Sequence, residues 1–239
     1  MESSNPLLSR NIDISRDREM TSSMNLEGVV NKTGILLLLC LAAGAFSWSQ
    51  PQLQGLFIYG GLIGGTITFL IGMFKPSSTP FTAPLYAVFE GLCLGALSQL
   101  INVRFPGIMV NALLLTFGVL AVMLFLYVTR IIRVTSTLVK GVLMATAAVA
   151  LVYVVDMIMG MFGTRVPYIH ETGMIGVTIS LVIVGIAAFN LLIDFAVIEN
   201  NIRQRAPKYM EWYCGMALLV TIVWLYLELL RLLSKLRSR

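Results

Sequence analysis

Charged side chains are scarce in this sequence. They make up 12% of the 239 residues, whereas 57% are hydrophobic and the mean hydropathy is +0.85. A soluble domain usually carries about one quarter charged residues. The scarcity therefore excludes an ordinary soluble domain and predicts that lipid surrounds most of the chain. The net charge of +5 comes from basic residues in short loops and at the ends, a distribution that sets membrane topology and does not favour nucleic acid as a partner.

Cysteine and histidine are scarce as well. The three cysteines are isolated inside apolar runs, which favours packing over a disulfide or a metal site, and the lone histidine, His170, falls in a predicted loop. No cofactor is expected. The seventh apolar run has no lysine for a Schiff base, which argues against retinal photochemistry. Adjacent runs hold no Ser–His pair and the acids show no GxGD-type pattern, so the sequence does not predict an enzyme.

Seven long apolar runs follow a polar stretch, 1–32, that lacks the apolar region of a cleavable signal peptide. The runs lie near 33–49, 54–74, 84–103, 107–129, 138–162, 174–198 and 211–233. A short helix is expected to enter the membrane from about Met24, and the first run, which is the shortest, can include a turn from 28–32. About 20 helical residues cross the hydrocarbon layer of a bilayer, which is about 30 Å thick. The sequence therefore predicts an all-α integral membrane protein with a polar cytoplasmic tail at 1–32, a seven-transmembrane-helix bundle at 33–233 and a basic C-terminal end at 234–239.

Basic residues are unevenly divided between the two membrane sides. If the tail is inside, eleven of the 17 Lys and Arg residues lie on the inner side. The positive-inside rule then predicts a cytoplasmic N-terminus, in the plasma membrane of a bacterium or, alternatively, in an endomembrane. The four basic residues at the C-terminal end oppose this trend, because full spanning of the seventh run places them outside. They are Arg231, Lys235, Arg237 and Arg239. A seventh segment that only re-enters the membrane would remove the conflict; full spanning is the favoured prediction.

Small residues predict where helices approach each other closely. Residues 60–65 (GGLIGG) contain two overlapping GxxxG patterns, and Gly91 with Gly95 forms a third. In lipid, such spacing lets two helix backbones come into contact. A packing role is therefore favoured over a ligand site.

Four acids lie inside the apolar runs, where a carboxylate costs at least a few kcal/mol. They are Glu90, Asp156, Asp194 and Glu228. Helix rise places Glu90 and Asp194 near the inner ends of their runs, and Asp156 and Glu228 near the outer ends. This predicts an inner pair and an outer pair of acids. Glu211, at the inner start of the seventh run, could join the inner pair.

Two further residues are predicted to support these acids. Arg231 follows Glu228 by three residues, a spacing at which the two side chains pair along one helix face. Asn190 precedes Asp194 by one turn on the same face, so it is predicted to hydrogen-bond to that carboxyl.

A pair of buried carboxyls could couple proton binding to helix packing. Two carboxyls that share a low-dielectric site do not ionise together easily, so one keeps its proton and the pair titrates as a unit. Protonated, the pair holds two helices by a hydrogen bond; deprotonated, it repels and leaves oxygens suited to Ca²⁺. This favours a pH-gated cation path with Asp194 as proton sensor, and with Asp194 and Glu90 as candidate Ca²⁺ ligands. A local structural bond is the alternative for each acid, most of all for Asp156 and Glu228.

Three segments resemble the Bax inhibitor family, the seven-helix proteins with a transmembrane Bax-inhibitor motif. They are 90–95 (EGLCLG), 192–195 (LIDF) and 224–228 (WLYLE), within a resemblance that runs from about Leu26 to Leu236 and is most similar to a bacterial branch. The resemblance implies a pH-sensitive Ca²⁺ leak channel whose proton sensor is a pair of aspartates on the sixth and seventh helices. It also implies, for some bacterial relatives, modulation of a membrane-bound protease.

The resemblance carries over to individual acids. Asp194 matches the first aspartate of the implied pair, and Glu90 is similar to an acid that precedes glycine in an early helix of the family. The second place of the pair is open to two residues: Glu228 has the similar Leu-Tyr-Leu-acid string, and Glu211 has the better depth.

The favoured hypothesis is a pH-sensitive calcium or other cation leak channel that is gated by buried carboxylates. One alternative is a non-conducting membrane partner that modulates a membrane-bound protease, with the polar tail as its handle. Another is a proton-coupled transporter of small solutes. The expected partners are the bilayer, Ca²⁺ and H⁺ and, under the first alternative, the protease.

Overall fold

A computed structural model describes residues 23–164, 171 and 173–238 of the chain, and within these residues the regular structure is helical. Seven α-helices are long and apolar enough to cross a membrane. They are α2 (Leu26–Trp48), α3 (Gln54–Phe74), α4 (Thr79–Arg104), α5 (Ile108–Val128), α6 (Ser136–Met161), α7 (Met174–Arg203) and α8 (Met210–Arg237). Single 3-10 turns, η1 (Pro51–Leu53) and η2 (Pro76–Ser78), precede α3 and α4. The predicted all-α seven-helix bundle is confirmed.

The first membrane helix includes the end of the polar stretch. α2 begins at Leu26, close to the short helix expected from about Met24, and it continues without a break into the apolar run predicted from 33. The cause of this start is a cap: the Asn25 side chain accepts a hydrogen bond of 2.6 Å from the Gly28 N–H, which satisfies a free donor of the first turn. Residues 1–22 of the predicted tail and His170 lie outside the described residues.

Three further helix ends extend beyond the predicted runs. α4 begins at Thr79 and continues through Pro84, where the sequence suggested that the run begins. α7 continues to Arg203, and α8 continues to Arg237 beyond the predicted 233. Polar residues at these ends are bonded within the protein, so the helices do not stop at the last apolar residue.

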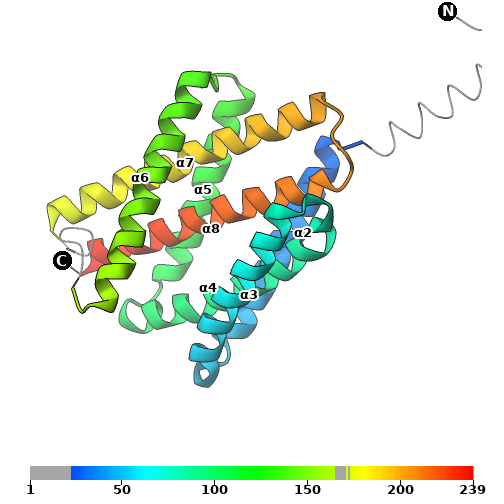
Figure 1. The fold of residues 1–239 in the computed structure, drawn as a ribbon. Coiled ribbons are helices and arrows are strands. Elements are labelled where there is room, and N and C mark those ends of the chain that lie inside the picture. Colours follow the sequence, from blue (N-terminus) through cyan, green and yellow to red (C-terminus); the bar gives the residue numbers. More distant parts are fainter. Residues whose placement is uncertain (1–22, 165–170, 172, 239) are drawn as a thin grey trace, which may run out of the picture.

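The last helix, α8, lies at the centre of the bundle (Figure 1). It contacts α2, α4, α5 and α7. Its 28 residues form one uninterrupted helix, about 42 Å long at 1.5 Å per residue. It starts at the end of the bundle where α2 starts and finishes at the opposite end (Figure 1). This course fits full spanning and not a re-entrant segment.

Small residues join α2, α3 and α4 at close range. A Cβ atom added at Gly91 would lie 2.2 Å from the Cys40 carbonyl oxygen, and one at Gly95 would lie 2.2 Å from that of Gly44. α3 approaches α4 in the same manner at Gly61. A larger residue at these places would force the helices apart, as the spacing predicted.

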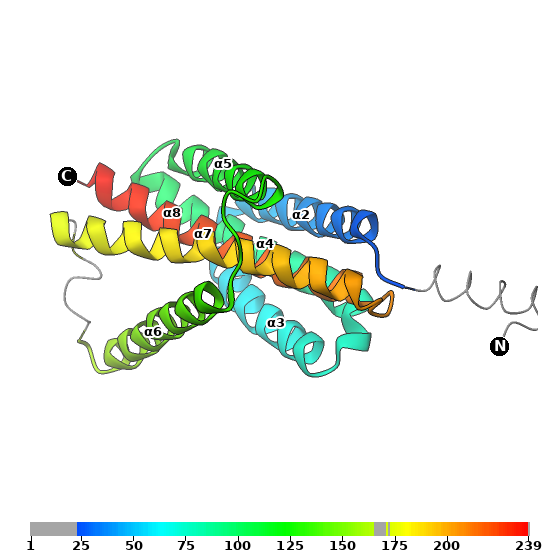
Figure 2. The ribbon, with the colours of Figure 1, turned by 90° about the horizontal axis from the view of Figure 1, so that it is seen from above.

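The fifth of the seven membrane helices, α6, lies at the edge of the bundle (Figure 2). α6 packs mainly against α7 and diverges from it toward one side (Figure 2). α2 and α5 lie together on the other side of α7 and α8 (Figure 2). Most of the α6 surface is therefore left for lipid, whereas α8 is enclosed by protein.

Candidate functional site

The Asp194 carboxyl lies at the interface of α7 and α8. Its helix neighbours Leu191 and Ile198 belong to the apolar core that these two helices share. Across the interface the carboxyl interacts with Thr221 and, electrostatically, with Cys214. These two α8 residues are seven apart, so they lie on one face of that helix. No second acid stands among these neighbours.

One oxygen of Asp194 is buried without a bond. Oδ2 has no hydrogen-bond partner among the residues that the structure describes. The prediction that Asn190 would bond to this carboxyl is wrong. The Asn190 amide instead donates to the Thr146 hydroxyl of α6 (2.8 Å) and to the Ile186 carbonyl of its own helix (2.9 Å). Both hydrogens of the amide are thus used elsewhere, because α6 offers an acceptor on that side.

Glu90 lies in a different part of the bundle, on α4. Its neighbours are Tyr86, Cys40 and Cys93, and its carboxyl faces Gly65 of α3, where an added Cβ would lie 3.3 Å from Oε2. Among the described residues, the interactions of Glu90 do not include Asp194, and those of Asp194 do not include Glu90. The structure therefore does not bring the predicted inner pair together.

Glu211 does not join Asp194 either, because basic groups surround it. Its fully buried carboxyl pairs with Lys32 of α2 and with Lys208 (2.9 Å), and it accepts the Asn25 backbone N–H (3.0 Å). Gly28 packs directly against the same carboxyl, where a side chain would collide with it. Glu211 thus ties the start of α2 to the start of α8, a structural role that explains its burial.

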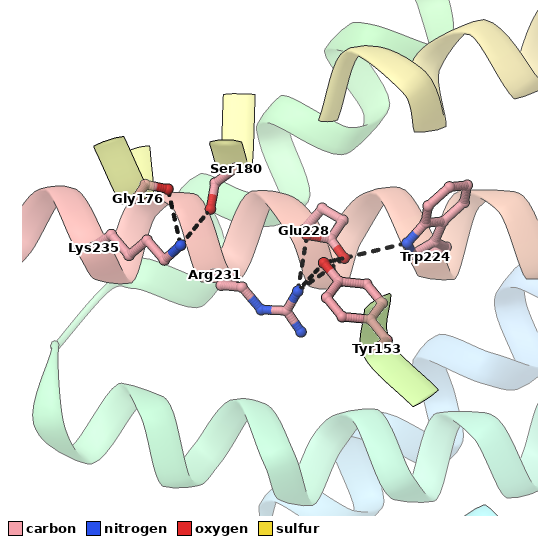
Figure 3. A network of polar contacts seen from close by, with 7 residues as sticks. All are labelled: Tyr153, Gly176, Ser180, Trp224, Glu228, Arg231 and Lys235. Carbon is pink, nitrogen blue, oxygen red and sulfur yellow. Dashed lines mark hydrogen bonds and ion pairs between the residues drawn. The ribbon is translucent and has the colours of Figure 1, made fainter. Parts of the chain in front are cut away.

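Glu228 lies in a saturated network near the other end of α8 (Figure 3). The predicted pair with Arg231 is confirmed, since Nη1 lies 3.1 Å from both carboxyl oxygens. Oε1 also accepts from the Tyr153 hydroxyl (2.8 Å) and from the Trp224 indole N–H (3.2 Å). Arg231 in turn bonds to the Tyr153 hydroxyl and lies over its ring. Donors from three side chains therefore hold this carboxyl in place, which favours the structural interpretation of Glu228.

The same end of α8 is also tied to α7. Buried Lys235 donates to the Gly176 carbonyl (2.9 Å) and to the Ser180 hydroxyl (2.8 Å) (Figure 3). Two of the basic residues that opposed the positive-inside trend, Arg231 and Lys235, are therefore bonded inside the bundle and are not loop charges. Asp156 lies half-buried on α6, three residues after Tyr153, which is the α6 residue that donates to Glu228.

Sequence reasoning missed the residues that complete these clusters. Each of these residues lies on another helix than the acid that it contacts: Thr221 contacts Asp194, Tyr153 contacts Glu228 and Lys32 contacts Glu211. Thr221 and Tyr153 carry no charge, so a search for acid and base partners passes over them. Lys32 was predicted at the boundary between the tail and the first run, and not as the partner of an acid.

The described residues hold no cluster of three or more His, Cys, Asp or Glu side chains that could bind a metal ion. A closed Ca²⁺ site needs six to eight oxygen ligands. What the arrangement offers instead is one carboxyl, Asp194, that lacks a counter-charge at the interface of the central helix. Such a group can exchange a proton and alter helix packing without binding a metal.

Comparison with known proteins gives one result for nearly the whole chain. No curated protein and no solved structure matches the sequence. The family model described as Bax inhibitor 1 like matches residues 5–238. This range includes all seven helices and each of the acids above. The chain is therefore a multi-pass membrane protein that belongs to the Bax inhibitor 1 like family.

Proposed function

We propose that this protein is a pH-sensitive cation leak channel, with Ca²⁺ as the candidate ion, in which protonation of Asp194 controls the packing of α7 on α8. The Ca²⁺ leak is implied by the family resemblance. The observation that carries the proposal is the Asp194 carboxyl itself: it is enclosed between two transmembrane helices, and its Oδ2 has no hydrogen-bond partner among the described residues.

The proposed gate follows from the cost of burying a charge. An unpaired carboxylate in an apolar interface is far less stable than the neutral acid. The neutral acid therefore fits the packed α7–α8 interface, where Leu191 and Ile198 enclose it. Loss of the proton as the pH rises would leave an uncompensated charge between the helices and favour their separation. Because α8 also contacts α2, α4 and α5, its displacement would reach most of the bundle.

The proposed sensor differs from the one that the resemblance implies. Asp194 faces a threonine hydroxyl, Thr221, and not a second carboxyl. A single carboxyl titrates in one step, whereas a coupled pair titrates in two. We therefore expect a single-step pH response that extends over about two pH units. As a leak channel the protein needs neither a catalytic residue nor a cofactor.

The test is Ca²⁺ entry into proteoliposomes that enclose a Ca²⁺-sensitive dye, measured between pH 6 and pH 8. We expect flux through the unchanged protein to rise with pH, and flux through Asp194→Asn to stay at the low-pH level throughout, because asparagine cannot lose a proton. Glu27→Gln is the control, since it removes an exposed carboxyl of α2.

A gain of a second carboxyl sharpens the same test. Thr221→Asp should broaden the pH response of the flux into two steps, because it places an acid beside Asp194. An Asp194→Asn protein with unchanged flux and pH response would overturn the proposal. Vesicles that take up no Ca²⁺ at any pH would favour the two rivals, a non-conducting partner of a membrane protease and a proton-coupled solute transporter.

A further inference from the structure

An apolar crevice lies between α2 and α5. These two helices lie together on the side of the bundle away from α6 (Figure 2). The volume of the crevice is about 780 Å³. The walls come from α2 and α5, and α7 with Leu218 of α8 forms the floor. The apolar lining residues are Leu26, Val29, Val30, Leu37, Leu120, Leu124 and Val128 on the walls and Phe195, Ile198 and Ile202 on the floor. Lipid tails are the solvent at this depth, so the crevice is open to them.

One end of the crevice is strongly basic. Arg130 and Arg203 close it, and both pair with Glu199, at 3.0 Å in the case of Arg130. A second cavity of about 510 Å³ adjoins this end, shares both arginines and adds Arg133. Arg130, Arg133 and Arg203 form the arginine cluster. Three guanidinium groups against one carboxylate leave a local excess of positive charge where α5 and α7 end.

The crevice has the length of one acyl chain. Leu120 precedes Arg130 by ten residues, which is about 15 Å along a helix. On α2, the wall from Leu26 to Leu37 covers about 16 Å. Both lengths equal about half of the 30 Å hydrocarbon layer, which is the depth of one leaflet. The arginine cluster then lies at the level of the lipid phosphates.

A cavity on the other half of the same helix pair provides an internal comparison. It has a similar volume, about 610 Å³, and a similarly apolar lining from α2, α4, α5 and α8, but no arginine or lysine borders it. Both cavities therefore have space for an acyl chain, but only the crevice between α2 and α5 has basic side chains that can bind an anionic headgroup.

We propose that the crevice between α2 and α5 is a binding site for an anionic phospholipid, whose phosphate lies at the arginine cluster and whose acyl chain lies along α2. Guanidinium groups bind phosphate oxygens in a bidentate manner, and basic pockets between transmembrane helices bind anionic headgroups. The apolar walls select a lipid over a soluble phosphate. This site is separate from Asp194 and does not rest on the proposed channel function.

The experiment is native mass spectrometry of the full chain in detergent. The protein is titrated with dioleoylphosphatidylglycerol, dioleoylphosphatidylcholine or glycerol 3-phosphate, and the retained adducts are counted. We expect phosphatidylglycerol to be retained at least about fivefold more than phosphatidylcholine, and glycerol 3-phosphate not to compete.

Two variants test the two halves of the site. Arg133→Gln should lower retention of phosphatidylglycerol about fivefold, because each basic side chain contributes about that factor, while Lys75→Gln removes a charge outside both cavities and should change nothing. Gly34 lines the crevice, and an added Cβ there meets no atom within 4 Å, so a side chain at this position can start into the crevice, and Gly34→Phe is chosen to fill it. It should abolish the retained lipid, whereas Gly118→Phe, on an exposed face of α5, should not.

Three results would contradict the proposed lipid site. Equal retention of the two lipids, or an Arg133→Gln protein that retains phosphatidylglycerol as before, would overturn the proposal. Full competition by glycerol 3-phosphate would also overturn it, since the site would then recognise a soluble phosphate. Gly34→Phe also provides a folding control, because its thermal midpoint should equal that of the unchanged protein.

Discussion

α6 and α8 have nearly the same hydropathy and opposite surroundings. The most apolar window of α6 has a mean hydropathy of 2.2, and that of α8 has 2.0. Yet 6% of the α6 window is buried, compared with 67% of the α8 window. Apolar composition places both helices in the membrane and does not distinguish a lipid-facing helix from the centre of the bundle.

Buried charge makes the distinction that hydropathy does not. Among the described residues, the charged side chains that are buried are Glu211, Glu228 and Lys235, and all three belong to α8. Each has a partner on another helix, so each needs protein around it on several sides. A helix that faces lipid on most sides has too few protein neighbours to pair several buried charges of its own. It is the charged residues that are buried, and not those that only lie in an apolar run, that belong to the helix that other helices enclose.

The largest expected effect comes from removing an anchor of α8. Glu211→Ala leaves Lys32 and the Asn25 backbone N–H without their buried acceptor, and breaking a buried ion pair in this way costs about 3 kcal/mol. We expect a clear fall in the thermal midpoint in detergent, and release of the start of α2 in hydrogen exchange. Glu27→Gln, on the exposed face of α2, is the control. An unchanged midpoint would show that the anchor contributes little to stability.

A smaller effect on stability is expected when a leucine is replaced by alanine in α8 and, for comparison, in α6. Leu219→Ala in α8 empties space at a fully buried position and should cost about 2 kcal/mol through lost contacts. Leu151→Ala in α6 removes the same atoms from a side chain that is 65% exposed, so it should cost less than about 0.5 kcal/mol. Chemical denaturation in mixed micelles measures both. Equal costs would contradict the difference in burial on which the comparison depends.

The smallest effect concerns the polar contacts of α6. Tyr153→Phe removes the hydroxyl that joins α6 to Glu228 and Arg231, and a hydrogen bond between transmembrane helices contributes about 1 kcal/mol. We expect faster hydrogen exchange over α6 with a nearly unchanged thermal midpoint, because the rest of the bundle does not depend on this helix. Tyr59→Phe, at a 70% exposed position on α3, should leave both measurements as they were.

The sequence predicts the seven helices well because hydropathy is a property of each segment by itself. Their ends are predicted less well. Lys32 and Lys235 read as the polar edges of apolar runs, although both lie inside helices and are bonded to partners. Because those partners come from other helices, no pattern in the local sequence indicates them.

The candidate site was likewise predictable where contacts lie within one helix and unpredictable where they join two helices. The Glu228–Arg231 pair could be predicted, because both residues lie on one helix at a spacing of three. The surroundings of Asp194 could not, since they depend on how α7 meets α8 and on a neutral residue, Thr221, at the contact. Depth along a helix indicates the level of a side chain in the membrane but not the direction in which it points. Glu90 and Asp194 share a predicted level, but the interactions of neither include the other.

The central position of α8 bears on the order in which the protein is made. The ribosome delivers α2 to α7 before α8, so six helices enter the bilayer before the one around which they assemble. Until then Lys32 lacks the Glu211 carboxylate with which it pairs in the complete bundle. Packing of these seven helices can therefore be completed only after α8 has been translated, and a chain that stops before α8 leaves the other six helices without the helix that α2, α4, α5 and α7 contact.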